Sequence, residues 1–365
     1  MSHPIPKPGI LSIAPYVGGE SVLKGVETVR KLSSNEGPLG ASPLALAAYR
    51  DLSARLHRYP DGHCVALRRA IAERHELDME RIVCGNGSDE MIGLLCHAYA
   101  GPGDEVLHSA HGFLMYAIYA KSAGATPVAA KETDLTTDVD ALLAAVTPRT
   151  KVVFVANPNN PTGTYIDIED MTRLRAGLRS DILLVIDAAY AEFVEAPGYS
   201  DGQELVDALG ANTVMTRTFS KLHGLGGIRL GWAYCPPSIA DVLNRARSPF
   251  NVSAPAQAAG VAAMEDVSFQ MKAKAHNDDW LPWLSRELEG LGLHLTPSVA
   301  NFVLAGFKDE AQATDADAYL RAHGIIVRRM GAYGLPHTLR ITIGLAEDNR
   351  AVTEAVENFM EAQRG

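Results

Sequence analysis

The stretch TRTFSKLHGLGGIR, residues 216–229, decides the fold prediction because it closes a series of alternating strands and helices. Residues 213–218 are predicted to form a strand, after which the chain turns into a glycine-rich run. Two earlier strands, 152–155 and 182–186, are continuously apolar and are therefore predicted to be buried on both faces. This alternation predicts an α/β fold with a largely parallel sheet between helical layers.

The expected elements define three regions. Strands are expected at 81–84, 105–108, 126–130, 151–156, 182–187 and 213–218, and helices at 43–55, 64–75, 91–99, 113–123, 139–145 and 168–177. Beyond residue 249, a helical stretch (254–290) precedes strands at 300–305, 325–328 and 338–343 and a final helix from 347. We therefore predict an N-terminal arm (1–45), a large domain (46–250) and a smaller α+β domain (251–365).

Composition limits the class of protein. The chain has 365 residues, 47% hydrophobic and 21% charged, which suits a globular protein of two domains. A formal net charge of −10 argues against nucleic acid or an anionic membrane as a general partner. The cysteines form no C-x-x-C pair, the N-terminus has no apolar signal segment, and no apolar run approaches a membrane span. These features predict a cytoplasmic protein.

Lys221 has neighbours that suit a reactive amine. It follows two hydroxyl residues, Thr218 and Ser220, and Arg229 comes eight positions later. A lysine becomes a nucleophile when desolvation or nearby cations lower its pKa, and hydroxyls with an arginine suit a phosphate. The segment therefore favours a lysine that reacts with a phosphorylated aldehyde cofactor, pyridoxal phosphate. A solvated lysine before a glycine loop is the alternative, and this segment alone does not decide between them.

Polar residues follow the other predicted strands. In a parallel sheet, ligands bind beyond the carboxyl ends of the strands, which places 157–163, 187–190 and 218–221 in one cleft. Asp187 could hold the ring nitrogen of the cofactor, or could merely cap the following segment. Asn160 and Tyr190 could hydrogen-bond a ring hydroxyl, although the segment NPNNPTG is also typical of a plain turn.

The segment GNGSDE, residues 85–90, joins a strand to a helix and predicts an anion site at the helix start. It is not a dinucleotide fingerprint, because Glu90 replaces the third glycine and no βαβ unit precedes it. A nicotinamide dehydrogenase is therefore disfavoured. Phe113 could stack on a ring or pack in the core. His108 and His111 have a possible ligand spacing, but no acidic or cysteine partner lies close in sequence, so no metal is predicted.

The set N-P-T-G (160–163), D-x-x-Y (187–190), T-x-S-K (218–221) and Arg229 resembles the fold-type I, pyridoxal-phosphate-dependent aminotransferases. Further segments resemble the histidinol-phosphate aminotransferase branch: APY (14–16), LSSNE (32–36), RYPDG (58–62), GSDE (87–90), GIIVR (324–328) and LRITIG (339–344). The resemblance implies a large domain with a mostly parallel seven-stranded sheet and a smaller C-terminal domain. It also implies a homodimer with shared active sites.

The resemblance assigns a role to each matching residue. Lys221 matches the lysine that condenses with the cofactor, and Asp187 matches the partner of the ring nitrogen. Other cofactor ligands are implied at Ser88, Asp89, Phe113, Asn160, Tyr190, Thr218, Ser220 and Arg229, with Tyr59 reaching the neighbouring subunit's cofactor phosphate. Substrate-binding residues are implied at Tyr16, Asn35, Arg328 and Arg340. Lys221, Asp187 and Tyr190 are the catalytic candidates.

The implied reaction is transfer of an amino group from L-histidinol phosphate to 2-oxoglutarate. One departure concerns the substrate: the family segment N-E-N-P is here N-E-G-P, with Gly37 in place of an asparagine. An aromatic amino acid aminotransferase and a threonine-phosphate decarboxylase share the same cofactor ligands and stay open as alternatives. A non-catalytic cofactor-binding protein is disfavoured, because the lysine, the aspartate and the phosphate ligands occur together.

Overall fold

A seven-stranded sheet forms the centre of the computed structural model, which describes residues 4–7, 9–15, 18, 20–25, 28–208 and 212–363. The strands are ordered β2-β10-β9-β8-β7-β3-β4. All neighbours pair in parallel except β10, which is antiparallel to both β2 and β9. Their bounds are β2 Ile82–Gly85, β3 Glu105–Ser109, β4 Thr126–Ala130, β7 Thr150–Ala156, β8 Leu183–Asp187, β9 Thr213–Thr218 and β10 Gly231–Tyr234. The predicted mostly parallel sheet is confirmed.

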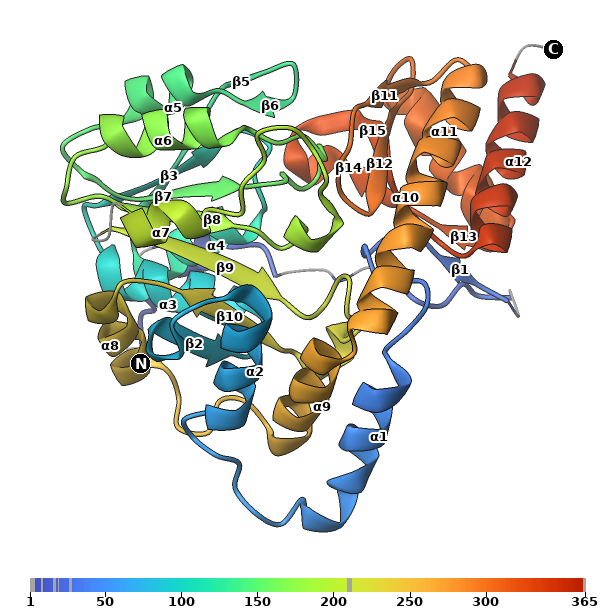
Figure 1. Ribbon diagram of the computed structural model, residues 1–365. Helices are drawn as coiled ribbons and strands as arrows, with labels where there is room; N and C mark the ends of the chain where they lie inside the picture. Colours follow the sequence, from blue (N-terminus) through green and yellow to red (C-terminus); the bar gives the residue numbers. More distant parts are fainter. Residues whose placement is uncertain are drawn as a thin grey trace.

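Both faces of this sheet are buried, as the apolar strands require. Val152 and Phe154 of β7 face a core shared with α3 (Ser88–Tyr99), α4 (Met115–Ala123) and α8 (Pro237–Ala246). Val153 and Val155 alternate with them and face α5 (Val139–Ala145) and α6 (Ile168–Gly177) on the other side. Figure 1 shows the sheet between these helices.

A second, four-stranded antiparallel sheet, ordered β11-β12-β15-β14, follows in the C-terminal part of the chain. Its strands are β11 His294–Thr296, β12 Phe302–Gly306, β14 Arg328–Met330 and β15 Leu335–Thr342. It packs against α10 (Val267–Gly290) and α11 (Glu310–Ala322), and α12 (Ala346–Ala362) packs against these two helices (Figure 1). The predicted boundary near residue 250 between two domains stays a prediction.

The N-terminal segment crosses to both parts of the molecule. The strand β1 (Arg30–Lys31) pairs in parallel with β13 (Ile325–Ile326), and α1 (Pro43–Asp51) packs against α9 (Ala254–Glu265) (Figure 1). The remaining elements are α2 (Val65–His75), α7 (Gln203–Ala208), the hairpin β5 (Glu132–Thr133) and β6 (Thr136–Thr137), and short 3-10 turns at Ile10–Ser12, Ser53–Arg55, Met79–Arg81, Ala191–Phe193, Gly226–Ile228 and Gly331–Tyr333.

The helical stretch expected over 254–290 is two helices. Asp266 separates α9 from α10, and its side chain accepts a hydrogen bond from the backbone N–H of Phe269, which caps the second helix. The sequence-based prediction also missed β10, β11, α7, α8 and α11.

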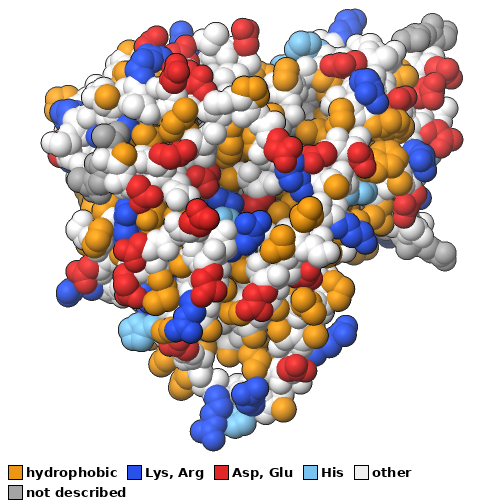
Figure 2. Space-filling view, viewed as in Figure 1, with side chains coloured by type: hydrophobic (Ala, Val, Ile, Leu, Met, Phe, Trp, Pro, Cys, Tyr) orange, Lys and Arg blue, Asp and Glu red, His pale blue; other side chains and the backbone are white. Residues whose placement is uncertain are grey.

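Acidic and basic side chains are interspersed over the face drawn in Figure 2, as the modest excess of acid suggests. Within the described residues, no helix combines the length and the apolar character that a membrane crossing needs.

Candidate active site

A cavity of about 270 Å³ lies at the carboxyl edge of the seven-stranded sheet, where the sequence predicted it. Its wall comes from the loops after β2, β3, β7, β8 and β9, from residues 33–36, and from β14 and β15. Of the predicted residues, it is lined by Asn35, Ser88, Asp89, Phe113, Asn160, Asp187, Tyr190, Thr218, Ser220, Lys221, Arg229, Arg328 and Arg340. Segments from across the whole chain therefore meet here.

Lys221 projects into this cavity from the loop after β9. Its Nζ donates to the backbone oxygen of Ser34 at 3.2 Å and lies 5.6 Å from the ring centre of Tyr190. Burial, followed by the nearby charge of Arg340, lowers the pKa of Lys221 to about 8. A useful fraction of the amine is thus unprotonated near neutral pH, as a nucleophile or proton carrier requires.

Asp187 ends β8 at the base of the cavity and is buried. Burial raises its pKa to about 6, although both carboxylate oxygens accept hydrogen bonds that favour the ionised form. Tyr116 Oη donates to Oδ2 at 2.8 Å, and Thr216 Oγ1 donates to Oδ1 at 3.2 Å. Sequence reasoning missed both donors. The only available signal was that Tyr116 follows Phe113 by one helical turn.

The predicted anion cradle assembles from two loops. Ser88 and Asp89 begin α3, whose first backbone N–H groups have no helical partner. Opposite them, Ser220 Oγ accepts from Thr218 Oγ1 at 3.0 Å and from Arg229 Nη1 at 3.3 Å. Arg229 Nη2 also pairs with the Asp89 carboxylate at 3.0 Å. Hydroxyls, a guanidinium and a helix start thus face one end of the cavity.

Glycine is required beside this cradle. Gly87 has φ +84°, and a Cβ atom there would lie 2.5 Å from Arg229 Nη2. A side chain would therefore clash with the guanidinium as well as strain the backbone. The glycine of the segment GSDE is explained by this close approach.

Asn35 with Tyr190, and Asn160 with Arg340, form two buried hydrogen-bonded pairs that line the cavity. Asn35 Nδ2 donates to Tyr190 Oη at 2.9 Å. Arg340 donates to Asn160 Oδ1 and, through Nη2, to the backbone oxygen of Ser33 at 2.8 Å. The substrate-side and cofactor-side candidates therefore hold one another in place.

Arg328 and Arg340 lie directly opposite each other in the register of β14 and β15. Paired residues on antiparallel strands point to the same face, so both arginines face the cavity. Tyr333 also lines the cavity and was missed by sequence reasoning, because its contacts involve residues distant in the chain.

Two predicted residues are not placed in this cavity. Tyr59 is 83% exposed, stacks on Phe250 with ring centres 4.8 Å apart, and lines a separate surface hollow. A single chain therefore does not bring it to the site. Tyr16 lies outside the described residues.

The residues present fit pyridoxal phosphate. The hydroxyls and the guanidinium suit a phosphate, the buried Asp187 suits a protonated ring nitrogen, and the amine of Lys221 belongs to the same cavity. Asn160 and Tyr190 offer polar groups on one side and Phe113 an aromatic ring. No metal chemistry is needed to explain any of these positions.

The fold and the cavity define a class of enzyme, and the comparisons agree. The family model for aminotransferase class I and II matches residues 27–359, and the chain belongs to this family. The resemblance drawn from the motifs is thus confirmed at the level of the family, and so is the predicted fold class.

Relatives within the family share one name. A histidinol-phosphate aminotransferase of Paramagnetospirillum magneticum is 62% identical over 364 residues, covering 99% of this chain and 100% of the relative. A histidinol-phosphate aminotransferase of Rhodospirillum centenum is 58% identical over 362 residues, covering 99% of this chain and 100% of the relative. Among solved structures, histidinol-phosphate aminotransferase from Sinorhizobium meliloti in complex with pyridoxal-5'-phosphate has a TM-score of 0.91 at 27% identity, covering 97% of both chains.

Proposed function

We propose that this protein is a pyridoxal-phosphate-dependent aminotransferase that converts L-histidinol phosphate and 2-oxoglutarate to imidazole acetol phosphate and L-glutamate. The observation that carries the proposal is full-length identity of 62% to a histidinol-phosphate aminotransferase. The geometry supports it, because Arg328 and Arg340 face one cavity together and both substrates end in an anion. A guanidinium can fork onto either a phosphate or a carboxylate.

The chain's own residues would divide the work as follows. Ser88, Ser220, Thr218 and Arg229 would hold the cofactor phosphate, Asp187 would accept a hydrogen bond from the ring nitrogen, and Asn160 and Tyr190 would hydrogen-bond the ring hydroxyl. Phe113 would stack on the ring, and Asn35 would keep Tyr190 oriented. Pyridoxal phosphate, when bound, supplies an electron-withdrawing ring that acidifies the Cα–H of the amino substrate.

Lys221 is the proposed proton carrier. With its pKa lowered to about 8, Nζ can lose and regain a proton at neutral pH. Arg340 is held by Asn160 and Ser33 before substrate arrives, so little ordering is needed when it binds the substrate anion. Arg328 would bind beside it. Tyr16 is a further proposed substrate contact, by the resemblance alone.

The proposal includes a cytoplasmic homodimer. Several exposed apolar side chains would be covered by a second copy: Leu44, Leu46, Tyr49, Leu56, Tyr59 and Phe250. In that assembly Tyr59 would reach the partner's phosphate cradle. A cytoplasmic location is supported by the four free, buried cysteines. Light scattering of the purified protein tests the dimer, and mixing Lys221→Ala with Tyr59→Phe chains tests the shared site.

The function is tested by absorbance spectra of the cofactor-loaded protein mixed with single amino donors, without a keto acid. L-histidinol phosphate should change the cofactor spectrum at a lower concentration than phenylalanine or threonine phosphate. Preference for phenylalanine would favour an aromatic amino acid aminotransferase. Release of CO₂ from threonine phosphate would favour a decarboxylase. Failure to take up pyridoxal phosphate would reject all three.

A further inference from the structure

His111 links the loop after β3 of the seven-stranded sheet to the turn after β14 of the four-stranded sheet. It lies in the loop between β3 and α4, two residues before Phe113. Its ring Nδ1 is 2.7 Å from the backbone oxygen of Tyr333, 222 positions away in the sequence. A carbonyl oxygen only accepts hydrogen bonds, so Nδ1 carries the proton. Tyr333 closes the 3-10 turn Gly331–Tyr333, which directly follows β14.

The backbone of His111 is fixed as well. Its N–H donates to Glu132 Oε1 of the β5–β6 hairpin at 3.0 Å, and its carbonyl oxygen accepts from Asn159 Nδ2 at 3.5 Å. Asn159 precedes Asn160, which binds Arg340. His111 therefore connects the loop of Phe113 with the turn of Asn160 and with the turn that follows Arg328.

Apolar contacts flank the hydrogen bond to Tyr333. Leu114 and Leu135 pack against a buried cluster of the four-stranded sheet, formed by Leu304, Met330, Tyr333 and Leu335. Hydrogen bonds shielded from water by such contacts are stronger than exposed ones. Apolar contacts between residues of the two parts of the molecule thus flank the hydrogen bond of His111 to Tyr333.

Among the described residues, no group of three or more His, Cys, Asp or Glu side chains is placed to hold a metal ion, and His108 and His111 belong to none. His108 Nδ1 lies 2.8 Å from the backbone oxygen of Ser109, whereas His111 Nδ1 is bound to Tyr333. His108 is thus bonded to its own sequence neighbour, whereas His111 links two segments that are distant in the sequence.

We propose that His111 is a positioning residue whose bond to Tyr333 sets the distance between Phe113 and the Arg328–Arg340 pair. That distance decides how long an amino substrate must be to reach the arginines with its distal anion. The inference rests on the proposed function, and it makes His111 a determinant of the preference for a phosphorylated donor. His111 itself would touch neither substrate nor cofactor.

The test compares His111→Ala with His111→Asn in the cofactor-loaded protein. Asparagine Nδ2 is attached to Cγ, as histidine Nδ1 is, and can donate the same bond. His111→Ala should raise KM for L-histidinol phosphate about 5–10-fold with little change in kcat. The ratio of kcat/KM for L-histidinol phosphate over L-histidinol should fall by a similar factor, and His111→Asn should restore most of it.

A matched control and a second measurement separate this role from general destabilisation. His97→Ala should leave the ratio unchanged, because its ring contacts only Gly93 and Ser122 on α3 and α4. In cofactor-free protein, amide hydrogen exchange at residues 331–335 should be faster in His111→Ala than in His111→Asn or the natural chain.

Equal loss of the ratio in the Ala and Asn variants would overturn the proposal, and so would an unchanged ratio in His111→Ala. Should the natural protein not use L-histidinol phosphate at all, the proposed function fails. Hydrogen exchange at 331–335 still tests the bond between His111 and Tyr333 in that case. An unchanged exchange rate in His111→Ala would show that His111 does not hold the turn.

Discussion

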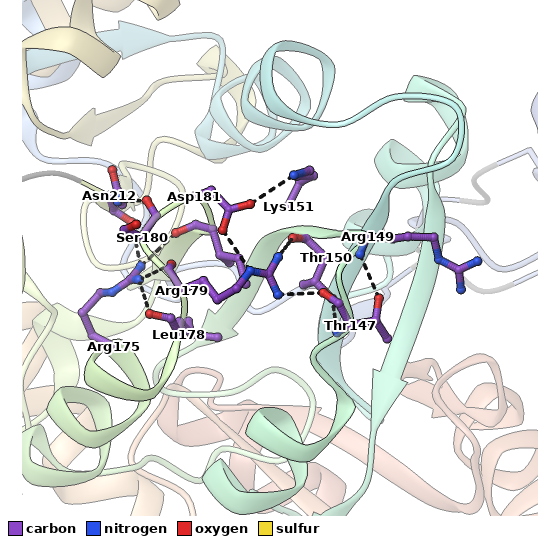
Figure 3. Close-up of polar contacts among 11 residues, drawn as sticks. Thr147, Arg149, Thr150, Lys151, Arg175, Leu178, Arg179, Ser180, Asp181 and Asn212 are labelled. Carbon is purple, nitrogen blue, oxygen red and sulfur yellow. Dashed lines mark hydrogen bonds and ion pairs between the residues drawn. The ribbon is translucent and has the colours of Figure 1, made fainter.

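The two edges of the seven-stranded sheet hold charged side chains in different ways. At the carboxyl edge, Lys221 and Asp187 face a cavity, and burial lowers the pKa of the lysine to about 8 and raises that of the aspartate to about 6. At the amino edge, shown in Figure 3, Arg175 and Arg179 instead bind the backbone that begins the strands.

Arg175 shows how completely a buried cation can be satisfied without an acid. Its Nη1 donates to the backbone oxygens of Ile182 and Asn212, at 2.9 and 3.3 Å. Its Nη2 donates to those of Leu178 and Arg179, at 3.0 and 2.9 Å (Figure 3). The carbonyl oxygens of Asn212 and Arg179 also accept backbone N–H groups, from Leu184 and Ile182, so Arg175 adds a second donor at these two positions. Arg175 therefore connects the end of α6 with the backbone that precedes β8 and β9.

The two edges differ in whether their charged side chains face a cavity, and this difference separates structural from reactive groups. Charged groups whose polar partners are all within the protein stabilise the fold, whereas charged groups with a shifted pKa that face a cavity are free to act on a ligand. Substitutions at the carboxyl edge should therefore lower activity, and substitutions at the amino edge should lower stability.

Lys221→Ala should have the largest effect, a loss of turnover of ~10²–10⁴-fold or more, because the proposed proton carrier is removed. The cofactor-free variant should unfold at the same urea concentration as the natural chain, since the lysine makes only one hydrogen bond. Stopped assays with L-histidinol phosphate measure turnover, and circular dichroism during urea titration measures unfolding. Turnover within tenfold of the natural rate would remove Lys221 from the mechanism.

Arg175→Met should lower stability and leave activity unchanged, the opposite of Lys221→Ala. It removes the side-chain donor on which the carbonyl oxygens of Ile182 and Leu178 depend, so the free energy of unfolding should fall by about 2–4 kcal/mol. Activity per folded molecule should stay the same. Urea titration measures the loss, and Arg173→Met, on the exposed face of the same helix, is the matched control. Equal midpoints for the two variants would refute the role given to Arg175.

Arg340→Lys should raise KM for L-histidinol phosphate or 2-oxoglutarate about tenfold, because lysine cannot form the guanidinium fork. Initial rates over a range of substrate concentrations measure this change. Arg329→Lys provides the control: Arg329 adjoins Arg328 in β14, points to the opposite face and lies near Glu310. A KM change of similar size in both variants would contradict the assignment.

Uptake of pyridoxal phosphate by the cofactor-free protein should depend on pH through Lys221. The folded-state pKa of about 8 lies below the ordinary value of 10.5, so the reactive base form increases as pH rises through 8. The uptake rate should therefore increase about tenfold between pH 7 and pH 9 and then level off. Absorbance after rapid mixing measures it. A rate that keeps rising towards pH 10 would mean that the amine is not desolvated.

The smallest effect is expected from Asp181→Asn at the amino edge. Asp181 pairs with Arg179 and Lys151 in solvent (Figure 3), and solvent screening leaves such pairs little net value. The urea midpoint should not move measurably at neutral pH. A clear shift would show that the exposed pairs, and not Arg175 alone, hold this edge together.

Local sequence patterns predicted the sheet well. Helices α5 and α6 begin and end at the residues predicted from the sequence, and the apolar strands lie within a residue or two of their predicted bounds. Burial on both faces leaves a strong apolar signal in each strand. By contrast, β10 has only four residues after a glycine run, too few to show a period.

The site was predictable only in part. Lys221, Asp187 and Asn160 follow predicted strands, so the geometry of a parallel sheet already places them together. Tyr116, Tyr333 and His111 act through contacts between elements distant in sequence, which no local pattern records. Tyr59 could not be tested within one chain, because its predicted partner belongs to a second copy.

The pairing of Thr218 with Gly231 has a consequence for engineering. Residues 219–230 leave and re-enter the sheet on adjacent strands, so Lys221 and Arg229 share one closed loop of fixed length. Inserting or deleting a single residue there would turn the amine away from the phosphate end, whatever residue was used. Redesign of donor choice should therefore keep this loop's length and vary the rim at β14 and β15 instead.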